Sequence, residues 1–180
     1  YEETTLHFLS KFAEEAIRFA AVRPSSSVLD VACGPGTVGR LLGTSVQDIH
    51  AIDFSEDMVR LFQSEIQKNN WSHIHVKVGD GQHLPFEAHS FDAAFSMFGL
   101  MFFPDRLKGF TELLHCLKPG GKAIVSSWAP VIDSPAMMHM FGAIRAAKPD
   151  FPPPQTNILN LENPEVFEKE MKTAGFQDNL

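Results

Sequence analysis

Three acidic residues, Asp30, Asp53 and Asp80, stand at or just beyond short apolar segments typical of buried strands. The run GPGTVG (34–39) follows the first of them and formally satisfies the pattern that binds dinucleotides. In a dinucleotide site a pyrophosphate lies on the helix N-terminus after that run, and a carboxylate at position 30 would repel it. Asp30 suits instead a ligand that carries an ammonium group.

The elements that must position these acids alternate along the chain. The expected strands cover 28–32, 49–53, 73–78, 91–96 and 122–128, and the expected helices cover the opening stretch up to Ala20, 37–42, 55–66, 105–117, 136–147 and 164–174. This alternation predicts an α/β fold with a doubly wound, parallel sheet wrapped on both faces by helices. Since such sheets bind ligands at the carboxyl ends of their strands, we expect the acids to gather there.

Composition limits the classes of protein. The 180 residues are 44% hydrophobic and 21% charged, which is typical of one globular domain over residues 1–180. The net charge of −7 disfavours binding to a nucleic-acid backbone, and no apolar run approaches the length of a membrane span. Two cysteines are too few for a disulfide framework, so a reducing, cytoplasmic compartment is expected.

Four segments resemble the motifs of class I S-adenosylmethionine-dependent methyltransferases. VLDVACGPG (28–36) resembles the first motif, and AIDFSEDMV (51–59), VGDGQHLPFEAHSFDAAFS (78–96) and LKPGGKAIVSSW (117–128) are similar to the later ones, in the family's order and spacing. The small-molecule branch that includes ubiquinone and menaquinone methyltransferases is the most similar. The resemblance implies a Rossmann-related fold with a mainly parallel sheet. It also implies that the sixth and seventh strands are incomplete, because GFQDNL (175–180) reads as the start of the sixth.

The resemblance implies S-adenosylmethionine as the cofactor. Asp30 would hold its amino group, Asp53 its ribose hydroxyls and Asp80 its adenine amino group. Gly34 and Gly36 would let the backbone approach the methionine part. The implied cofactor-binding residues are Asp30, Ala32, Gly34, Gly36, Asp53, Phe54, Met58, Asp80, Gly81, Gln82 and Ser96. A single Asp more often serves as a helix cap or turn residue, but three acids at successive strand ends disfavour that use.

Two apolar-rich segments, 98–104 and 128–154, follow the fourth and fifth strands and favour a small, apolar or aromatic acceptor. Residues 129–163 are expected to form an insertion or lid over the acceptor side; a stabilising lid without a substrate role stays open. The NPPY motif of relatives that methylate nucleobases and glutamines is absent, which disfavours a nucleic-acid or protein acceptor. His139 is the candidate general base if the acceptor is a hydroxyl, and a surface histidine is its alternative.

The sequence therefore predicts an enzyme that transfers a methyl group from S-adenosylmethionine to a small molecule. Two alternatives stay open, namely a cofactor-binding regulatory protein without turnover and a methyltransferase that acts on a macromolecule. No metal site is predicted: His73 and His75 share a strand face, but a solvated sheet edge explains them better. Cys33 is expected to be a small packing residue. The acceptor, the methylated atom and the oligomeric state do not follow from the sequence.

Overall fold

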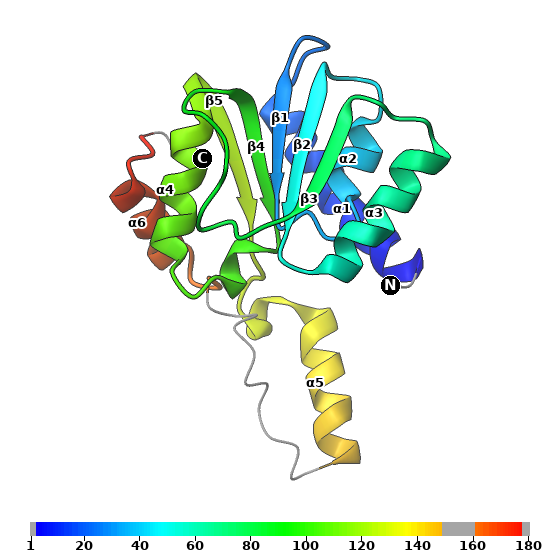
Figure 1. The fold of residues 1–180 in the computed structure, drawn as a ribbon. Helices are drawn as coiled ribbons and strands as arrows, with labels where there is room; N and C mark the ends of the chain where they lie inside the picture. The colour runs from blue at the N-terminus through cyan, green and yellow to red at the C-terminus, as the bar shows by residue number, and fades with distance from the viewer. Residues whose placement is uncertain (1–2, 149–160, 178–180) are drawn as a thin grey trace.

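A computed structural model describes residues 3–148 and 161–177 of the chain (Figure 1). Five parallel strands form one sheet in the order β3-β2-β1-β4-β5. Their bounds are β1 Ser27–Val31, β2 Asp48–Asp53, β3 Ile74–Val78, β4 Phe91–Met97 and β5 Leu117–Ser126. The predicted doubly wound α/β fold is confirmed. All five carboxyl ends lie at the lower edge of the sheet in Figure 1.

Helices cover both faces of this sheet (Figure 1). One face carries α1 (Glu3–Ala20), α2 (Thr37–Leu42) and α3 (Glu56–Lys68), and the other carries α4 (Arg106–Cys116) and α6 (Pro164–Ala174). The helix α5 (Pro135–Ala147) projects away from the carboxyl edge, and two short 3-10 turns, η1 (Leu100–Phe102) and η2 (Val131–Asp133), follow β4 and β5. None of the helices in the described residues combines the length and apolar character needed to cross a bilayer.

The helix ends follow from local chemistry. Ser55 caps α3 as predicted, since its hydroxyl accepts a hydrogen bond from the backbone N–H of Met58 at 3.4 Å. Asp105 caps α4 in the same way through the N–H of Lys108 at 2.9 Å. Gly175 ends α6 with a φ of +111°, a conformation that glycine adopts without strain.

The hydrophobic core has two halves because side chains alternate across the sheet. On β1, Val28 packs toward α1 and α2, whereas Leu29 and Val31 pack toward α4. The small residues of α1, among them Ala13 and Ala16, let that helix lie close to the first half. Asp30 lies between Leu29 and Val31 on β1 and is buried, although it is acidic.

One sequence prediction needs correction at the C-terminal side of the fold. The fifth strand begins at Leu117 and ends at Ser126, instead of covering 122–128. Leu117 pairs with Phe91 and the register resumes at Lys122 with Ala93, so the intervening LKPGG run is a bulge in the strand.

An incomplete sixth strand at 175–180 is expected to have no pairing partner from Phe176 onward, and the two described residues after Gly175 agree with this expectation. Phe176 and Gln177 are not in a strand, and the backbone N–H of Phe176 donates to the carbonyl of Met171 at 3.2 Å, which continues the cap of α6. Residues 178–180 lie outside the described part of the chain, as do residues 149–160 of the expected lid.

Candidate functional site

Asp30 carries the most unusual side chain at the carboxyl edge. It is only 1% exposed, and its Oδ2 atom has no hydrogen-bond partner among the described residues. Burial raises the pKa of this carboxyl from 3.8 to about 8, and the negative charge of Asp53 adds to the increase. Because burying an unpaired carboxylate is costly, a cation at this position would stabilise its ionised form.

Asp53, at the end of β2, accepts hydrogen bonds from the loop after β1 and from the turn before α3. Its Oδ2 atom accepts a hydrogen bond from the backbone N–H of Gly34 at 2.7 Å, and its Oδ1 atom accepts one from Ser55 at 2.8 Å. The carboxylate thus serves as the turn residue that the sequence analysis weighed as an alternative. Each oxygen has capacity for a further donor, so the predicted role toward ribose hydroxyls stays a prediction.

The glycines after β1 meet different surroundings. A Cβ atom on Gly36 would lie 2.1 Å from the ring of Phe62, so this glycine is needed for packing between α2 and α3. A Cβ atom on Gly34 would meet no atom within 4 Å, because its Cα faces open space. Gly34 has a φ of +55° and also holds its N–H against Asp53. The open side of the loop is therefore at Gly34.

Two further predicted residues lie beside this loop. Ala32, which directly follows β1, is partly buried and has a φ of +58°. Ser96, near the end of β4, is fully buried, and its hydroxyl oxygen has no hydrogen-bond partner among the described residues. Together with Asp30, Ser96 gives the edge two buried polar atoms that no residue of 3–148 or 161–177 satisfies, which is uncommon in native structures.

Phe54 and Met58 occupy the other side of the β2 end. Phe54 follows Asp53 directly and is 82% exposed, the most exposed of the large apolar residues described. Met58 is partly buried in the first turn of α3. Contacts of the Phe54 ring and the Met58 thioether with adenine therefore stay a prediction.

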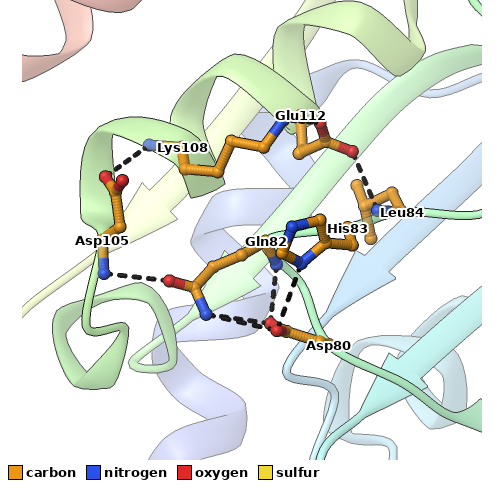
Figure 2. Close-up of polar contacts among 7 residues, drawn as sticks. All are labelled: Asp80, Gln82, His83, Leu84, Asp105, Lys108 and Glu112. Carbon is orange, nitrogen blue, oxygen red and sulfur yellow. Dashed lines mark hydrogen bonds and ion pairs between the residues drawn. The ribbon is translucent and has the colours of Figure 1, made fainter.

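Asp80 belongs to a hydrogen-bonded loop (Figure 2). Its Oδ1 atom accepts from the backbone N–H and the side-chain amide of Gln82, at 2.9 and 3.0 Å. These bonds, the backbone one first, lower the pKa of Asp80. A Cβ atom on Gly81 would lie 2.4 Å from the ring of Phe103, so this glycine too is needed for packing.

The helix α4 holds this loop through contacts that were not predicted from the sequence. Gln82 Oε1 accepts the backbone N–H of Asp105 at 2.9 Å, and Glu112 Oε2 accepts the N–H of Leu84 at 2.8 Å (Figure 2). Lys108 donates to the second oxygen of Glu112 at 2.6 Å. Burial acts to raise the pKa of Glu112, but these two hydrogen bonds outweigh it, and the pKa is lowered. Glu112 follows Lys108 by four residues on a helix. Such pairs are common on helix surfaces, so the spacing alone did not indicate that Glu112 holds the loop.

Other candidate residues lie apart from this edge. His139 is exposed on α5, a helix that projects away from the carboxyl edge of the sheet (Figure 1). The ring of His73 lies 2.7 Å from the carbonyl of Gly43, and His75 packs against His50. In residues 3–148 and 161–177, no group of three or more metal-ligating side chains is arranged to hold an ion. Burial raises the pKa of the Cys33 thiol well above its ordinary value, which fits a packing role.

A five-stranded parallel sheet in this order, with a glycine loop after β1 and an acid at the end of β2, defines a class I methyltransferase fold. Solved structures share it. A putative methyltransferase from Bacillus halodurans aligns with a TM-score of 0.74 over 94% of this chain and 71% of that one, at 22% identity. A putative S-adenosyl-L-methionine-dependent methyltransferase from Methanococcus maripaludis gives 0.73 over 97% and 80%, at 24% identity.

Residues 28–121 match the family described as "Methyltransferase domain", and the chain belongs to that family. A demethylmenaquinone methyltransferase of Bacillus cytotoxicus is 32% identical over 62% of this chain and 48% of its own length. The ubiquinone/menaquinone biosynthesis C-methyltransferase UbiE of Geobacter sp. strain M21 is 29% identical over 91% of this chain and 75% of its own. The chain spans about half the length of most of the curated relatives it matches.

Proposed function

We propose that the protein binds S-adenosylmethionine at the carboxyl edge of the sheet and transfers its methyl group to a small, apolar or aromatic molecule. The observation that carries the proposal is Asp30, a carboxyl that is 1% exposed and has one oxygen without a hydrogen-bond partner in the described part of the chain. A protein gains nothing in stability from such a group, so a ligand that supplies the missing cation is the best reason for it. The amino group of S-adenosylmethionine is such a cation.

The residues at this edge fit the rest of the cofactor. The open side of Gly34 leaves room that a Cβ atom would fill, and the spare acceptor capacity of Asp53 suits two hydroxyl groups. The exposed ring of Phe54 offers a face to adenine, and Asp80 offers its carboxylate to the adenine amino group. When bound, S-adenosylmethionine supplies a methyl group made electrophilic by the positive charge on sulfur.

Asp30 also moves a proton in this proposal. With its pKa at about 8, the carboxyl of the free protein is mostly protonated at neutral pH. An ammonium group beside it favours the carboxylate, so the proton leaves for solvent as the cofactor binds. Rate enhancement would then come mostly from holding the acceptor in line with the methyl group. We do not assign a general base, since His139 is exposed on α5.

A small acceptor is favoured by the relatives, whose names include quinone and menaquinone methyltransferases. The surface beyond β5 supports an apolar one, because Ile132 in η2 is 78% exposed and Met138 in α5 is 46% exposed. We take residues 129–163 as an insertion on the acceptor side of a single domain over residues 1–180. A macromolecular acceptor and a regulatory protein without turnover remain the competing proposals.

The test has a binding arm and a turnover arm. Calorimetric titration of the full-length protein should show heat with S-adenosylhomocysteine and none with NAD; the reverse result would refute the proposal. Asp30→Asn should weaken binding of S-adenosylhomocysteine, because it removes the anion without changing the shape. Release of S-adenosylhomocysteine in the presence of small hydroxynaphthoates or hydroquinones separates an enzyme from a module that only binds.

A further inference from the structure

Four aromatic side chains from three separate segments meet beyond the carboxyl edge. Phe8 and Phe12 come from α1, Phe98 follows β4 and Trp128 follows β5. The rings of Phe98 and Trp128 stack with centroids 4.4 Å apart, and Phe12 meets the Phe98 ring edge-on at 5.3 Å. Phe8 stacks on Trp128 at 6.3 Å and contacts Phe12 at 5.3 Å. These four residues are called the aromatic cluster below.

The backbone at the end of β4 connects the aromatic cluster with Ala32, the residue just before the glycine loop. Phe98 is followed by Gly99, where a Cβ atom would lie 2.4 Å from the Cβ of Ala32 and 3.2 Å from the hydroxyl of Ser96. The backbone N–H of Phe98 donates to Ser126 at 3.0 Å, and its φ is +56°. This conformation is costly for a bulky residue, and such strain is concentrated at functional sites. The strained backbone directs the Phe98 ring onto Trp128.

The helix α1 brings two exposed rings to the same place. In the middle of β5, Lys122 donates to the carbonyl of Phe19 at 3.0 Å, while Phe8 lies against Trp128 just beyond the carboxyl end of the strand. The helix therefore runs antiparallel to β5, with its N-terminal half at the carboxyl edge. Phe8 is 50% exposed and Phe12 is 41% exposed.

Phe98 and Trp128 pack against the core. The rings of Phe8 and Phe12 do not belong to it, because α1 contacts the core through Ala13, Ala16 and Ala20. Leaving large apolar rings half-exposed forgoes much of the free energy that their burial would supply. The rings would become buried if a flat molecule lay against them beside the glycine loop. A planar ring can stack on Phe98 or Trp128 and take edge contacts from α1, whereas a saturated ring lacks the π face for such contacts.

We infer that the aromatic cluster is the wall of the acceptor site, that Phe8 and Phe12 are specificity-determining residues, and that the acceptor carries a planar conjugated ring. This inference rests on the proposed function, since it extends the same site from the cofactor to the acceptor. It adds α1, which the sequence analysis did not connect with the acceptor.

The test compares two alcohols of one carbon skeleton, 1-naphthol and decahydro-1-naphthol, by calorimetry on the full-length protein saturated with S-adenosylhomocysteine. We expect 1-naphthol to bind about tenfold more tightly, from the sum of several aromatic contacts. Phe8→Leu and Phe12→Leu keep an apolar side chain, and each should weaken 1-naphthol roughly threefold to tenfold while leaving decahydro-1-naphthol and S-adenosylhomocysteine unaffected. Phe19→Leu is the matched control, because Phe19 is 68% exposed on the same helix and lies outside the aromatic cluster.

Equal affinity for the two alcohols would overturn the inference, as would equal effects of the Phe12→Leu and Phe19→Leu variants. A second copy of this chain is the other possible occupant of the aromatic cluster, and sedimentation of the same variants tests it. A dimer that is lost in the Phe8→Leu variant would show that the rings bind a second copy, and this result would also overturn the inference. The titrations are repeated without S-adenosylhomocysteine. If that ligand fails to bind but the preference for 1-naphthol persists, the proposed function fails and the aromatic site stands; if both fail, both are refuted.

Discussion

Ala32 and Gly99 pack so closely that there is room for a Cβ atom on only one of them. The Cβ atom of Ala32 lies 2.4 Å from the position that a Cβ atom on Gly99 would take. Ala32 follows β1 and Gly99 precedes η1, so this contact joins the glycine loop to the segment after β4. Ala32 has a φ of +58°, in the left-handed region that favours glycine. The absent side chain at position 99 therefore makes room for a methyl group at a strained position.

The two positions should be strongly coupled in stability. Ala32→Gly should stabilise the protein by roughly 0.5–1 kcal/mol, since relief of the left-handed strain exceeds the entropy that glycine loses on folding. Gly99→Ala should destabilise it by about 1–3 kcal/mol through overpacking, and less so in the Ala32→Gly background. Urea unfolding of the four proteins measures the coupling, and strictly additive effects would contradict the shared space.

The buried Asp30 should make stability depend on pH. Its folded pKa of about 8 lies above the ordinary 3.8, so between these values the folded state keeps a proton that the unfolded state releases. The contribution of Asp30 is fully present below about pH 4 and is lost as pH rises toward 8, by on the order of 1 kcal/mol per pH unit. The amide in the Asp30→Asn variant does not titrate. The difference in unfolding free energy between this variant and the wild type should therefore grow in favour of the variant as pH rises. Urea unfolding at about pH 5 and about pH 7.5 tests this, and an equal gain at both would refute it.

Asp53 should contribute to ligand binding and to stability together. Asp53→Ala removes the acceptor for Gly34 and Ser55, which should cost about 1–3 kcal/mol of unfolding free energy. It should also weaken binding of S-adenosylhomocysteine at least about tenfold. The reason is that the two charge-assisted hydrogen bonds that we propose between Asp53 and the ribose hydroxyls would be lost. Ser55→Ala is the control, since it removes only the cap on Met58. A similar loss of affinity in both variants would mean that Asp53 acts solely by shaping the start of α3.

Glu112 should position the Asp80 loop from a distance. Glu112→Ala leaves the N–H of Leu84 without its acceptor, so the loop between Asp80 and Leu84 is held less firmly. We expect affinity for S-adenosylhomocysteine to fall about threefold, and discrimination against its inosine analogue to fall as well, because we propose that the adenine amino group donates a hydrogen bond to Asp80 in this loop. Glu168→Ala, which removes an exposed ion pair with Lys172, should change neither quantity. An unaltered preference for adenine would count against the positioning role.

His139→Ala should leave turnover within roughly twofold of the wild type once an acceptor is known, since exposed substitutions away from a site have small effects. Initial rates at saturating acceptor and cofactor measure this. A loss of about a hundredfold at unchanged cofactor affinity would instead identify His139 as the general base.

The sequence by itself determined the fold class and the edge of the sheet at which the acidic residues lie, because both depend on local patterns. Apolar strand runs alternating with amphipathic helices leave essentially one doubly wound arrangement, and the bounds of the helix over 164–174 were predicted to the residue. Acids such as Asp30 and Asp53 come directly after or within those runs, so their gathering at one edge follows from parallel strands. The bulge at LKPGG was missed, because a proline and two glycines indicate a turn equally well.

Only the tertiary structure decided which role each of these residues has. Gly36 and Gly81 are small because Phe62 and Phe103 pack over them, whereas Gly34 faces open space, and spacing in the sequence cannot separate these cases. The contacts of Glu112 with Leu84 and of Phe12 with Phe98 join residues that lie far apart along the chain. The pKa of Asp30 depends on complete burial and on a carboxylate from another strand. Such properties arise from the environment that distant segments create, which no local pattern contains.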